Sequence, residues 1–180
     1  MFVQTEVTPN PNSLKFLPGK NVSNSGSFEV TKKEDTDSDL VRNLLSINGV
    51  TGVFLGEDFL SINKKEDIIW EDIKHIVISL INDFYATGKE FVIANELSEE
   101  KNKELNEIEK KIISILETKI RPAVAKDGGD IKFKEFKDGI VKVELQGSCS
   151  GCPSSTMTLK QGVQNLLCHY LPEVKEVVAI

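Results

Sequence analysis

The sequence predicts an α+β protein composed of two small α/β domains. Segments in which apolar and polar residues alternate, as in strands, are mixed with segments in which apolar residues recur every three or four positions, as in helices. A highly charged stretch at 95–107 separates two such halves, and a length of 180 residues fits one to two domains. We therefore expect a first domain at 1–88, a charged linker at 89–107 and a second domain at 108–180.

The first domain should begin with strands. Alternation predicts a strand at 2–7, the two prolines within 8–12 break it, and an apolar strip at 14–17 follows the break. Residues 20–27 are rich in Asn, Ser and Gly, which favours a loop before a short strand at 28–30.

A capped helix and a hairpin should come next. Asp37 and Ser38 belong to the residue types that cap helices, and they precede apolar residues spaced for a helix at 40–45. Two apolar runs, at 50–55 and 59–63, flank a Gly-Glu-Asp turn and therefore predict a hairpin.

A longer helix is predicted at 70–84, and Gly88 should end it. Six apolar residues share one face of this helix, and packing in a core explains that face: Trp70, Ile73, Val77, Leu80, Ile81 and Phe84. His75 falls on the polar side, where we expect a surface histidine.

The second domain should have the order α-β-β-α-β. Its first helix carries one apolar face, which Pro122 should kink or shorten and the double glycine 128–129 should end: Ile108, Ile112, Ile115, Leu116 and Ile120. A strand starting at Ile131 turns at Asp138-Gly139 into a strand at 141–145. A loop at 147–152 leads into a helix that Pro153 begins, and 174–180 forms a closing strand.

Composition and charge exclude several functions. A net charge of −6 argues against nucleic acid as a partner, because phosphate binding needs basic patches. No apolar run approaches the ~20 residues that span a bilayer, so we expect no membrane association. The beginning, MFVQTEVTPN, has the pattern neither of a secretory signal nor of an Arg-rich presequence. We expect a bacterial cytoplasmic protein, or one of an organelle matrix if a presequence was removed.

The most informative feature is the C-x-x-C pair formed by Cys149 and Cys152. It lies on a glycine-flanked loop directly ahead of a predicted helix, whose positive N-terminal end favours thiolate over thiol. Thiolates ligate soft metals and also carry out disulfide exchange, so both chemistries fit. The chain has three cysteines, and such a low, odd number does not suit the disulfide framework of a secreted protein.

A count of ligands favours a site shared by two chains. A closed zinc or iron–sulfur site uses four donors, and this pair supplies two. Cys168 lies 16 residues beyond Cys152, which is roughly 24 Å along a helix, and His169 fails for the same reason. A two-fold dimer would complete a Cys₄ site for zinc or an iron–sulfur cluster. The main alternative is a thioredoxin-like redox protein. Only 180 − 152 = 28 residues follow the motif, which are too few for the elements that a thioredoxin fold has there, so this alternative is less favoured.

The sequence holds no pattern of an enzyme. It lacks a Ser/His/Asp order, a phosphate-binding loop and an HExxH motif, so we expect no catalytic activity. Asp127 and Asp130 flank the double glycine, where capping and turning the chain is a better explanation than acid–base chemistry.

Several motifs resemble those of a known family. GSCSGCPSSTMTLK at 147–160, DGGDI at 127–131 and LPEV at 171–174 resemble the C-terminal domain of NifU-like proteins. TPNPNSLKFLPGK at 8–20 and INGVTGVFLGEDF at 47–59 look like the amino-terminal domain of Nfu-type scaffold proteins. The two matches together cover nearly the whole chain.

The resemblance implies an iron–sulfur scaffold or carrier. Such a protein holds a cluster, typically [4Fe–4S], between two subunits and delivers it to client apoproteins after receiving it from upstream assembly proteins. The implied ligands are Cys149 and Cys152 of each chain in a cluster-bound homodimer, and Cys168 is outside the family motif. Ser148, Ser150 and the N–H groups of Ser154 and Ser155 are candidates for hydrogen bonds that tune the cluster. The first domain would bind clients or assembly proteins, or serve only as a structural partner.

A redox protein with a Cys149–Cys152 disulfide and a zinc-bridged structural dimer stay open as alternatives.

Overall fold

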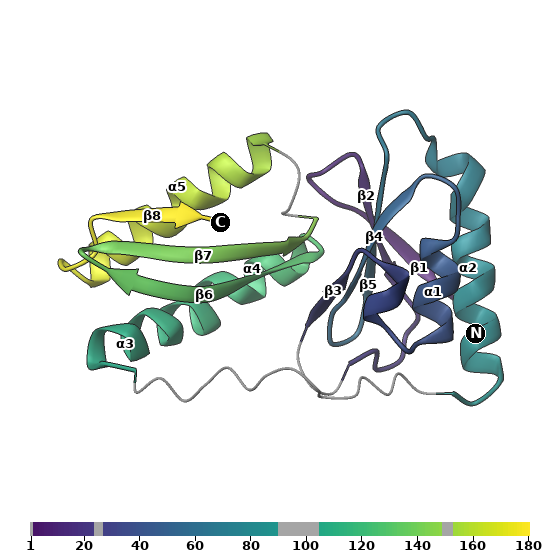
Figure 1. The fold of residues 1–180 in the computed structure, drawn as a ribbon, viewed down its shortest axis with the longest axis horizontal. Helices are drawn as coiled ribbons and strands as arrows, with labels where there is room; N and C mark the ends of the chain where they lie inside the picture. Colours follow the sequence, from purple (N-terminus) through teal and green to yellow (C-terminus); the bar gives the residue numbers. More distant parts are fainter. Residues whose placement is uncertain (1, 24–26, 90–104, 149–152) are drawn as a thin grey trace. The chain divides into compact units, whose positions relative to one another are not determined.

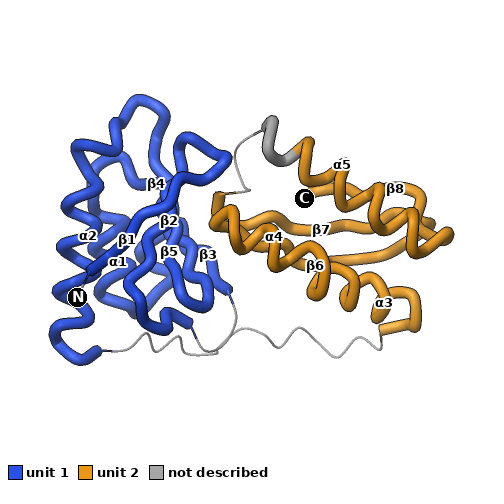
Figure 2. Tube along the Cα trace, turned by 180° about the vertical axis from the view of Figure 1, so that it is seen from behind, with its two compact units in different colours: residues 1–94 blue, residues 95–180 orange. Residues whose placement is uncertain are grey.

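The computed structural model describes residues 2–23, 27–89, 105–148 and 153–180, with the side chains of 153–156 left out. The chain divides into two compact units, Met1–Ala94 and Asn95–Ile180 (Figure 2). Both mix helices and strands, which confirms the α+β class predicted from the sequence. Within the described residues, no helix is both long and apolar enough to cross a membrane.

Unit 1 contains a five-stranded sheet in the order β1-β2-β5-β4-β3 (Figure 1). Every neighbouring pair is antiparallel. The strands match the predicted ones closely: β1 (Gln4–Val7), β2 (Ser13–Leu17), β3 (Phe28–Val30), β4 (Val50–Leu55) and β5 (Leu60–Lys64). The β4–β5 hairpin is the one that the two apolar runs predicted.

The first α-helix of unit 1 begins at a residue that caps it. In α1 (Asp39–Leu45), the Ser38 hydroxyl accepts the Val41 N–H at 3.4 Å, so Ser38 is the cap. Asp37, the other predicted cap, instead pairs with Arg42 at 3.4 Å. A short 3₁₀ turn, η1 (Lys33–Asp35), precedes this helix and was not predicted.

The long helix α2 (Trp70–Ala86) buries the expected face with one addition. Ile73, Val77 and Ile81 are buried as predicted, and Tyr85 extends the stripe by one more turn. The sequence interpretation did not include Tyr85, whose hydroxyl donates to the Asn21 carbonyl at 3.2 Å.

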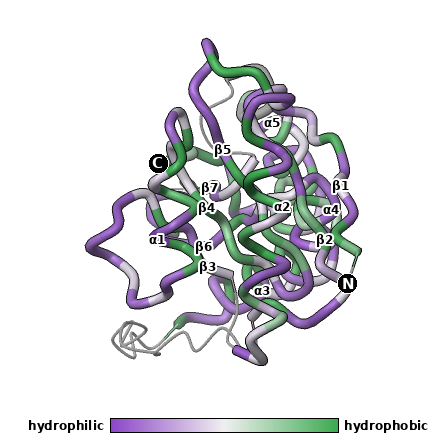
Figure 3. The backbone as a smooth tube through the Cα atoms, turned by 90° about the vertical axis from the view of Figure 1, so that its right-hand side faces the viewer, coloured by the Kyte–Doolittle hydropathy of each residue, from purple (hydrophilic) through white to green (hydrophobic). Residues whose placement is uncertain are grey.

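One face of the sheet carries the core of unit 1. The strand register places the apolar residues of β2, β4 and β5 on the same face, toward α1 and α2. The main contributors are Leu14, Phe16, Val53, Leu55, Leu60, Ile62, Leu40, Val41, Leu44, Val77 and Ile81. In Figure 3 the hydrophobic colouring lies on strands such as β4, as this packing requires.

Unit 2 begins with one continuous helical stretch in three segments: α3 (Glu107–Ile115), the π-helical η2 (Leu116–Ile120) and α4 (Arg121–Lys126). Asn106 and Glu109 form a reciprocal capping box at its start. The helix is not shortened at Pro122; the irregularity lies in the turn before it. Pro122 is the second residue of α4, which directly follows the π-helical turn.

The remaining elements complete the predicted α-β-β-α-β order. They are β6 (Gly129–Lys137), β7 (Ile140–Gly147), α5 (Pro153–Tyr170) and β8 (Glu176–Ala179). The sheet order is β6-β7-β8, with β8 parallel to β7. Asp138 and Gly139 have φ values of 54° and 78°, the left-handed pair of a tight hairpin turn, which confirms that prediction.

The helices of unit 2 cover one face of its sheet. Apolar residues of all three strands and of the helices form a single cluster: Ile112, Leu116, Val124, Ile131, Val141, Val143, Leu145, Val163, Leu167 and Val177. The opposite face carries ion pairs between neighbouring strands, Lys134 with Glu144 at 2.9 Å and Lys142 with Glu135 at 3.2 Å. This packing holds β7 and α5 in place. The end of β7 and the start of α5 flank the cysteine segment in the sequence.

Gly162 offers a test of the packing of α5. It is exposed in the middle of the helix, and a Cβ added there would meet no atom within 4 Å. We predict that Gly162→Ala raises the free energy of unfolding of unit 2 by about 0.5–1 kcal/mol, since alanine loses less backbone entropy on folding. Urea unfolding followed by far-UV circular dichroism measures it. Fluorescence of Trp70, the one tryptophan of the chain, reports unit 1 and should not change; a lower urea midpoint for unit 2 would refute the packing described for Gly162.

Candidate metal centre

The predicted ligands Cys149 and Cys152 lie outside the described residues. The structure describes the protein on both sides of that segment. Before it, β7 ends at Gly147 and Ser148 follows; after it, α5 begins at Pro153. These two anchors define where the cysteine segment leaves the fold and where it rejoins it.

The end of β7 is held tightly against the turn between α4 and β6. Gly147 pairs with Gly129 in the sheet register. Ser148 is 2% exposed, its N–H donates to the Gly128 carbonyl at 3.2 Å, and its hydroxyl donates to the Asp127 carbonyl. Gly128 and Gly147 have φ values of 84° and 70°, in the left-handed region that glycine adopts without strain. The segment therefore departs from a fixed point.

These bonds correct one hypothesis about tuning. The single hydroxyl proton of Ser148 goes to the Asp127 carbonyl, so it is not available to a sulfur atom. Ser150 lies outside the described residues, and α5 includes the backbone of Ser154 and Ser155.

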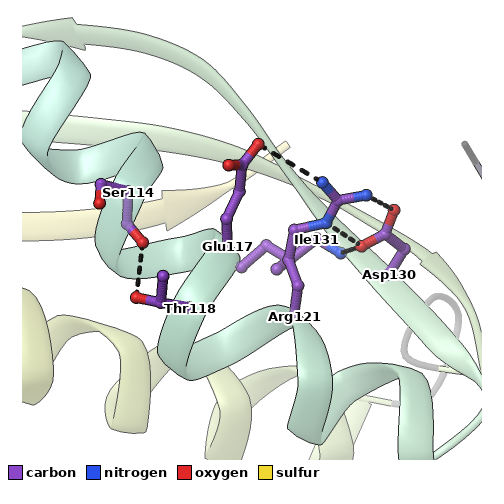
Figure 4. Close-up of polar contacts among 6 residues, drawn as sticks. All are labelled: Ser114, Glu117, Thr118, Arg121, Asp130 and Ile131. Carbon is purple, nitrogen blue, oxygen red and sulfur yellow. Dashed lines mark hydrogen bonds and ion pairs between the residues drawn. The ribbon is translucent and has the colours of Figure 1, made fainter.

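A buried carboxylate lies beside this turn. Asp130, at the start of β6 and opposite Gln146, is 4% exposed. It accepts two hydrogen bonds from Arg121, from Nε and Nη2 at 2.9 Å each, and a third from the Ile131 N–H at 2.8 Å (Figure 4). Glu117 lies 3.7 Å from the other side of the same guanidinium. The hydrogen bond to Asp130 is the main reason why the pKa of Arg121 lies above its usual value.

Sequence reasoning missed this ion pair. It assigned Asp127 and Asp130 to capping and turning the chain; Asp127 does end α4 and accepts from Ser148, whereas Asp130 is the partner of Arg121. A signal was present, because Arg42 and Arg121 are the only arginines among many lysines, and arginine is the cation that pairs with carboxylates through two parallel bonds.

The sequence of α5 and of the residues just before it contains few charged residues. Between Leu145 and Pro172 there is one charged side chain, Lys160, in 28 residues, whereas (22 + 28)/180 of the chain would give about eight. Met157, in the second turn of α5, is 72% exposed. The N-terminal end of α5 also carries the partial positive charge that stabilises a thiolate next to it.

The other candidate ligands are engaged elsewhere. Cys168 is half-buried near the far end of α5, where its thiol donates to the Val174 carbonyl at 3.2 Å. The ring of His169 packs edge-on against Tyr170 at 5.2 Å. His75 is exposed on α2, as predicted. In the described parts of the chain, no group of three or more His, Cys, Asp or Glu residues is arranged to hold a metal ion.

Comparison with known proteins gives the class of this two-part chain. The family model described as Scaffold protein Nfu/NifU N terminal matches residues 3–88, and the model described as NifU-like domain matches residues 112–178. The protein therefore combines an Nfu-type N-terminal part with a NifU-like domain that contains the cysteine pair.

Relatives align along almost the whole chain. NifU-like protein 4, mitochondrial, of Arabidopsis thaliana is 42% identical over 98% of this chain and 65% of its own length. The NFU1 iron-sulfur cluster scaffold homolog, mitochondrial, of Homo sapiens is 46% identical over 98% of this chain and 71% of its own length. This chain belongs to the Nfu family of NifU-like proteins. It spans about two thirds of the length of these relatives.

Among solved structures, the solution structure of the NifU-like protein from Saccharomyces cerevisiae is 32% identical to this chain. The match covers 53% of this chain and 87% of that one, with a TM-score of 0.47.

Ser148 provides a test of the anchor at the end of β7. We predict that Ser148→Ala lowers the free energy of unfolding of unit 2 by about 1 kcal/mol, because the buried Ser148 side chain loses its partly buried bond to the Asp127 carbonyl. Thr118→Ala is the control, since it removes a hydroxyl bond to the Ser114 carbonyl at 2.7 Å that is exposed. Urea unfolding of both variants measures the difference. Equal effects of the two substitutions would contradict a structural role for the Ser148 bond.

Proposed function

We propose that this chain is an iron–sulfur cluster carrier that holds a cluster, [4Fe–4S], between two subunits and transfers it to client apoproteins. The ligands are Cys149 and Cys152 of each chain. The observation that carries the proposal is the cysteine pair itself, in a chain whose relatives include proteins named as iron–sulfur cluster scaffolds. Thiolates in this number and kind suit an iron–sulfur core.

The proposal assigns one role to each part of the chain. Residues 108–180 form the cluster-binding domain, 89–107 the linker and 1–88 the amino-terminal Nfu-type domain. The first domain has two candidate roles, contact with clients or upstream assembly proteins and structural support.

The lack of acidic side chains in α5 supports a second copy of the chain as the partner. Two chains with a net charge of −6 each repel one another, so they meet most favourably through a surface without acidic groups. The sequence that follows the cysteines contains no acidic residue from 153 to 172, and exposed Met157 adds apolar area to α5. A two-fold axis at the cysteines would place the two α5 helices beside it.

Transfer in this proposal is an exchange of ligands, and the protein turns over no substrate. Client thiolates bind iron and displace the carrier thiolates in steps; each client thiol loses a proton and each released cysteine can take one up, so no electrons are needed. Two thiolates per chain leave the cluster partly accessible, which suits a carrier better than a permanent cofactor site.

Two alternatives stay in view. A thiol–disulfide redox protein would form a reversible bond between Cys149 and Cys152 within one chain and bind no iron. A zinc-bridged dimer would use the same four thiolates for a structural ion without colour. Family membership favours the cluster over both.

The compartment is also a proposal. The two relatives described above are named as mitochondrial proteins, which supports the organelle matrix over a bacterial cytoplasm.

Reconstitution without oxygen tests the proposal directly. The full chain is incubated with ferrous iron, sulfide and thiol, desalted, and assayed for iron, acid-labile sulfide, zinc and visible absorption. A carrier binds iron and sulfide in equal amounts with broad absorption of thiolate-bound iron. Colourless protein containing zinc, or protein with an intramolecular disulfide and no iron, would replace the proposal by the matching alternative.

Cysteine variants test the ligands. We predict that Cys149→Ser and Cys152→Ser each abolish cluster binding while the far-UV circular dichroism spectrum stays native, because each removes one of the donors without touching the described core. Cys168→Ser is the matched control and should load like the parent chain, since its thiol bonds to the Val174 carbonyl. Loss of the cluster from the Cys168 variant, or retention in either of the others, would overturn the assignment.

A charge placed on α5 tests the second copy. We predict that Met157→Glu reduces cluster-dependent dimerisation at least tenfold without changing the fold, because 72% of this residue is exposed in the single chain. Val7→Glu is the control: it adds the same charge at a position that is 89% exposed in unit 1. Sedimentation of reconstituted protein measures the dimer. Equal dimerisation of both variants would exclude this surface.

A further inference from the structure

Asp130 is buried at a place where a carboxylate needs strong compensation. Its side chain is 6% exposed, and an ionised group so placed is stable only with paired charge and hydrogen bonds. Both are present, in the two parallel bonds from Arg121 and the bond from the Ile131 N–H. Such a two-bond pair fixes the orientation of both groups, beyond attracting them.

The π-helical turn directs Arg121 toward Asp130. Leu116 and Val124 both lie in the core although they are eight residues apart. In a regular α-helix, at about 100° per residue, that separation would turn Val124 about 80° away from Leu116. A π-helical turn contains one extra residue, which compensates this rotation by about 100°. The extra residue is seen in the hydrogen bond from the Arg121 N–H to the Leu116 carbonyl, five residues earlier. Val124 thus stays in the core while Arg121 faces the start of β6 (Figure 4).

The start of β6 also contacts the end of β7, from which the cysteine segment continues. Asp130 follows Gly128 and Gly129, and these two glycines contact Ser148 and Gly147 through a backbone hydrogen bond and the sheet register. A shift of Asp130 therefore moves the backbone on which Ser148 rests.

We infer that Arg121 and Asp130 are positioning residues for the cluster site: their ion pair fixes the turn from which the cysteine segment departs. The inference rests on the proposed function. Neither residue is a ligand; they act through Gly128, Gly129 and Ser148. Residues that orient ligands from outside typically change metal affinity 10- to 100-fold when replaced.

Two variants of Arg121 test the inference in the full chain. Arg121→Gln removes the charge, and Arg121→Lys keeps it but loses the two parallel bonds. Lys142→Gln is the control, because it breaks the 3.2 Å pair with Glu135 on the open face of the same sheet. The Lys variant also guards against a Gln variant that fails to fold, since the paired charge on Asp130 is retained.

The first readout uses the protein without a cluster. Amide hydrogen exchange should speed up at least tenfold at Ser148 in both Arg121 variants, with the Val143 amide, in the middle of β7, unchanged. The Lys142 variant should match the parent chain. An unchanged Ser148 amide, or an equal rise at both amides, would mean that the pair only stabilises the domain, and the inference would be wrong.

The second readout uses the reconstituted protein. Release of iron to a chelator should be 10- to 100-fold faster from the Arg121 variants than from the parent chain and the Lys142 variant, with the Gln variant faster than the Lys variant. Equal release from all four proteins would overturn the inference while leaving the proposed function intact. A parent chain that binds no cluster at all would instead overturn the proposed function, and the exchange data would then stand alone as a test of the anchor.

Discussion

The pairing of a buried carboxylate with an arginine organises the end of unit 2 that carries the cysteines. Asp130 lies at the junction of the first helix and the sheet, and its two bonds to Arg121 join these elements. The turn at Gly128 and Gly129, just ahead of Asp130, contacts the last residues of β7. The first helical stretch, this turn and the β6–β7 hairpin therefore meet at one fixed corner of unit 2. The remaining sheet and α5 provide the core that makes this corner stable.

The fixed corner and the small number of sulfur donors fit together. A site with two thiolates per chain is not enclosed by one polypeptide, so its geometry depends on how well each chain presents its own pair. In the proposed two-chain site, a fixed departure point and a helix N-terminus would limit the arrangements open to each pair of thiolates. The lack of acidic side chains in the sequence of α5 would lower the cost of bringing two acidic chains together.

Most of the fold was predictable because its signals are local. The alternation in β1, the apolar strip in β2, the Asp138-Gly139 turn and the cap at Ser38 each depend on a few adjacent residues, and all were found. The π turn before Pro122 was not, because a proline indicates an interruption without showing which turn absorbs it. Arg121 was missed for a related reason: its partner depends on the rotation of the helix, which that turn sets. Residue type and spacing predict Cys149 and Cys152 as ligands, and both lie outside the described residues. The bond from Ser148 to Asp127 depends on contacts that sequence patterns do not contain.

Native mass spectrometry of the chain, reconstituted and handled without oxygen, is the most direct test of the shared site. The account predicts one species with the mass of two chains plus a single [4Fe–4S] core, and a return to single chains when the core is removed. A single chain that carries a complete core, or a two-chain species with one core per chain, would contradict it.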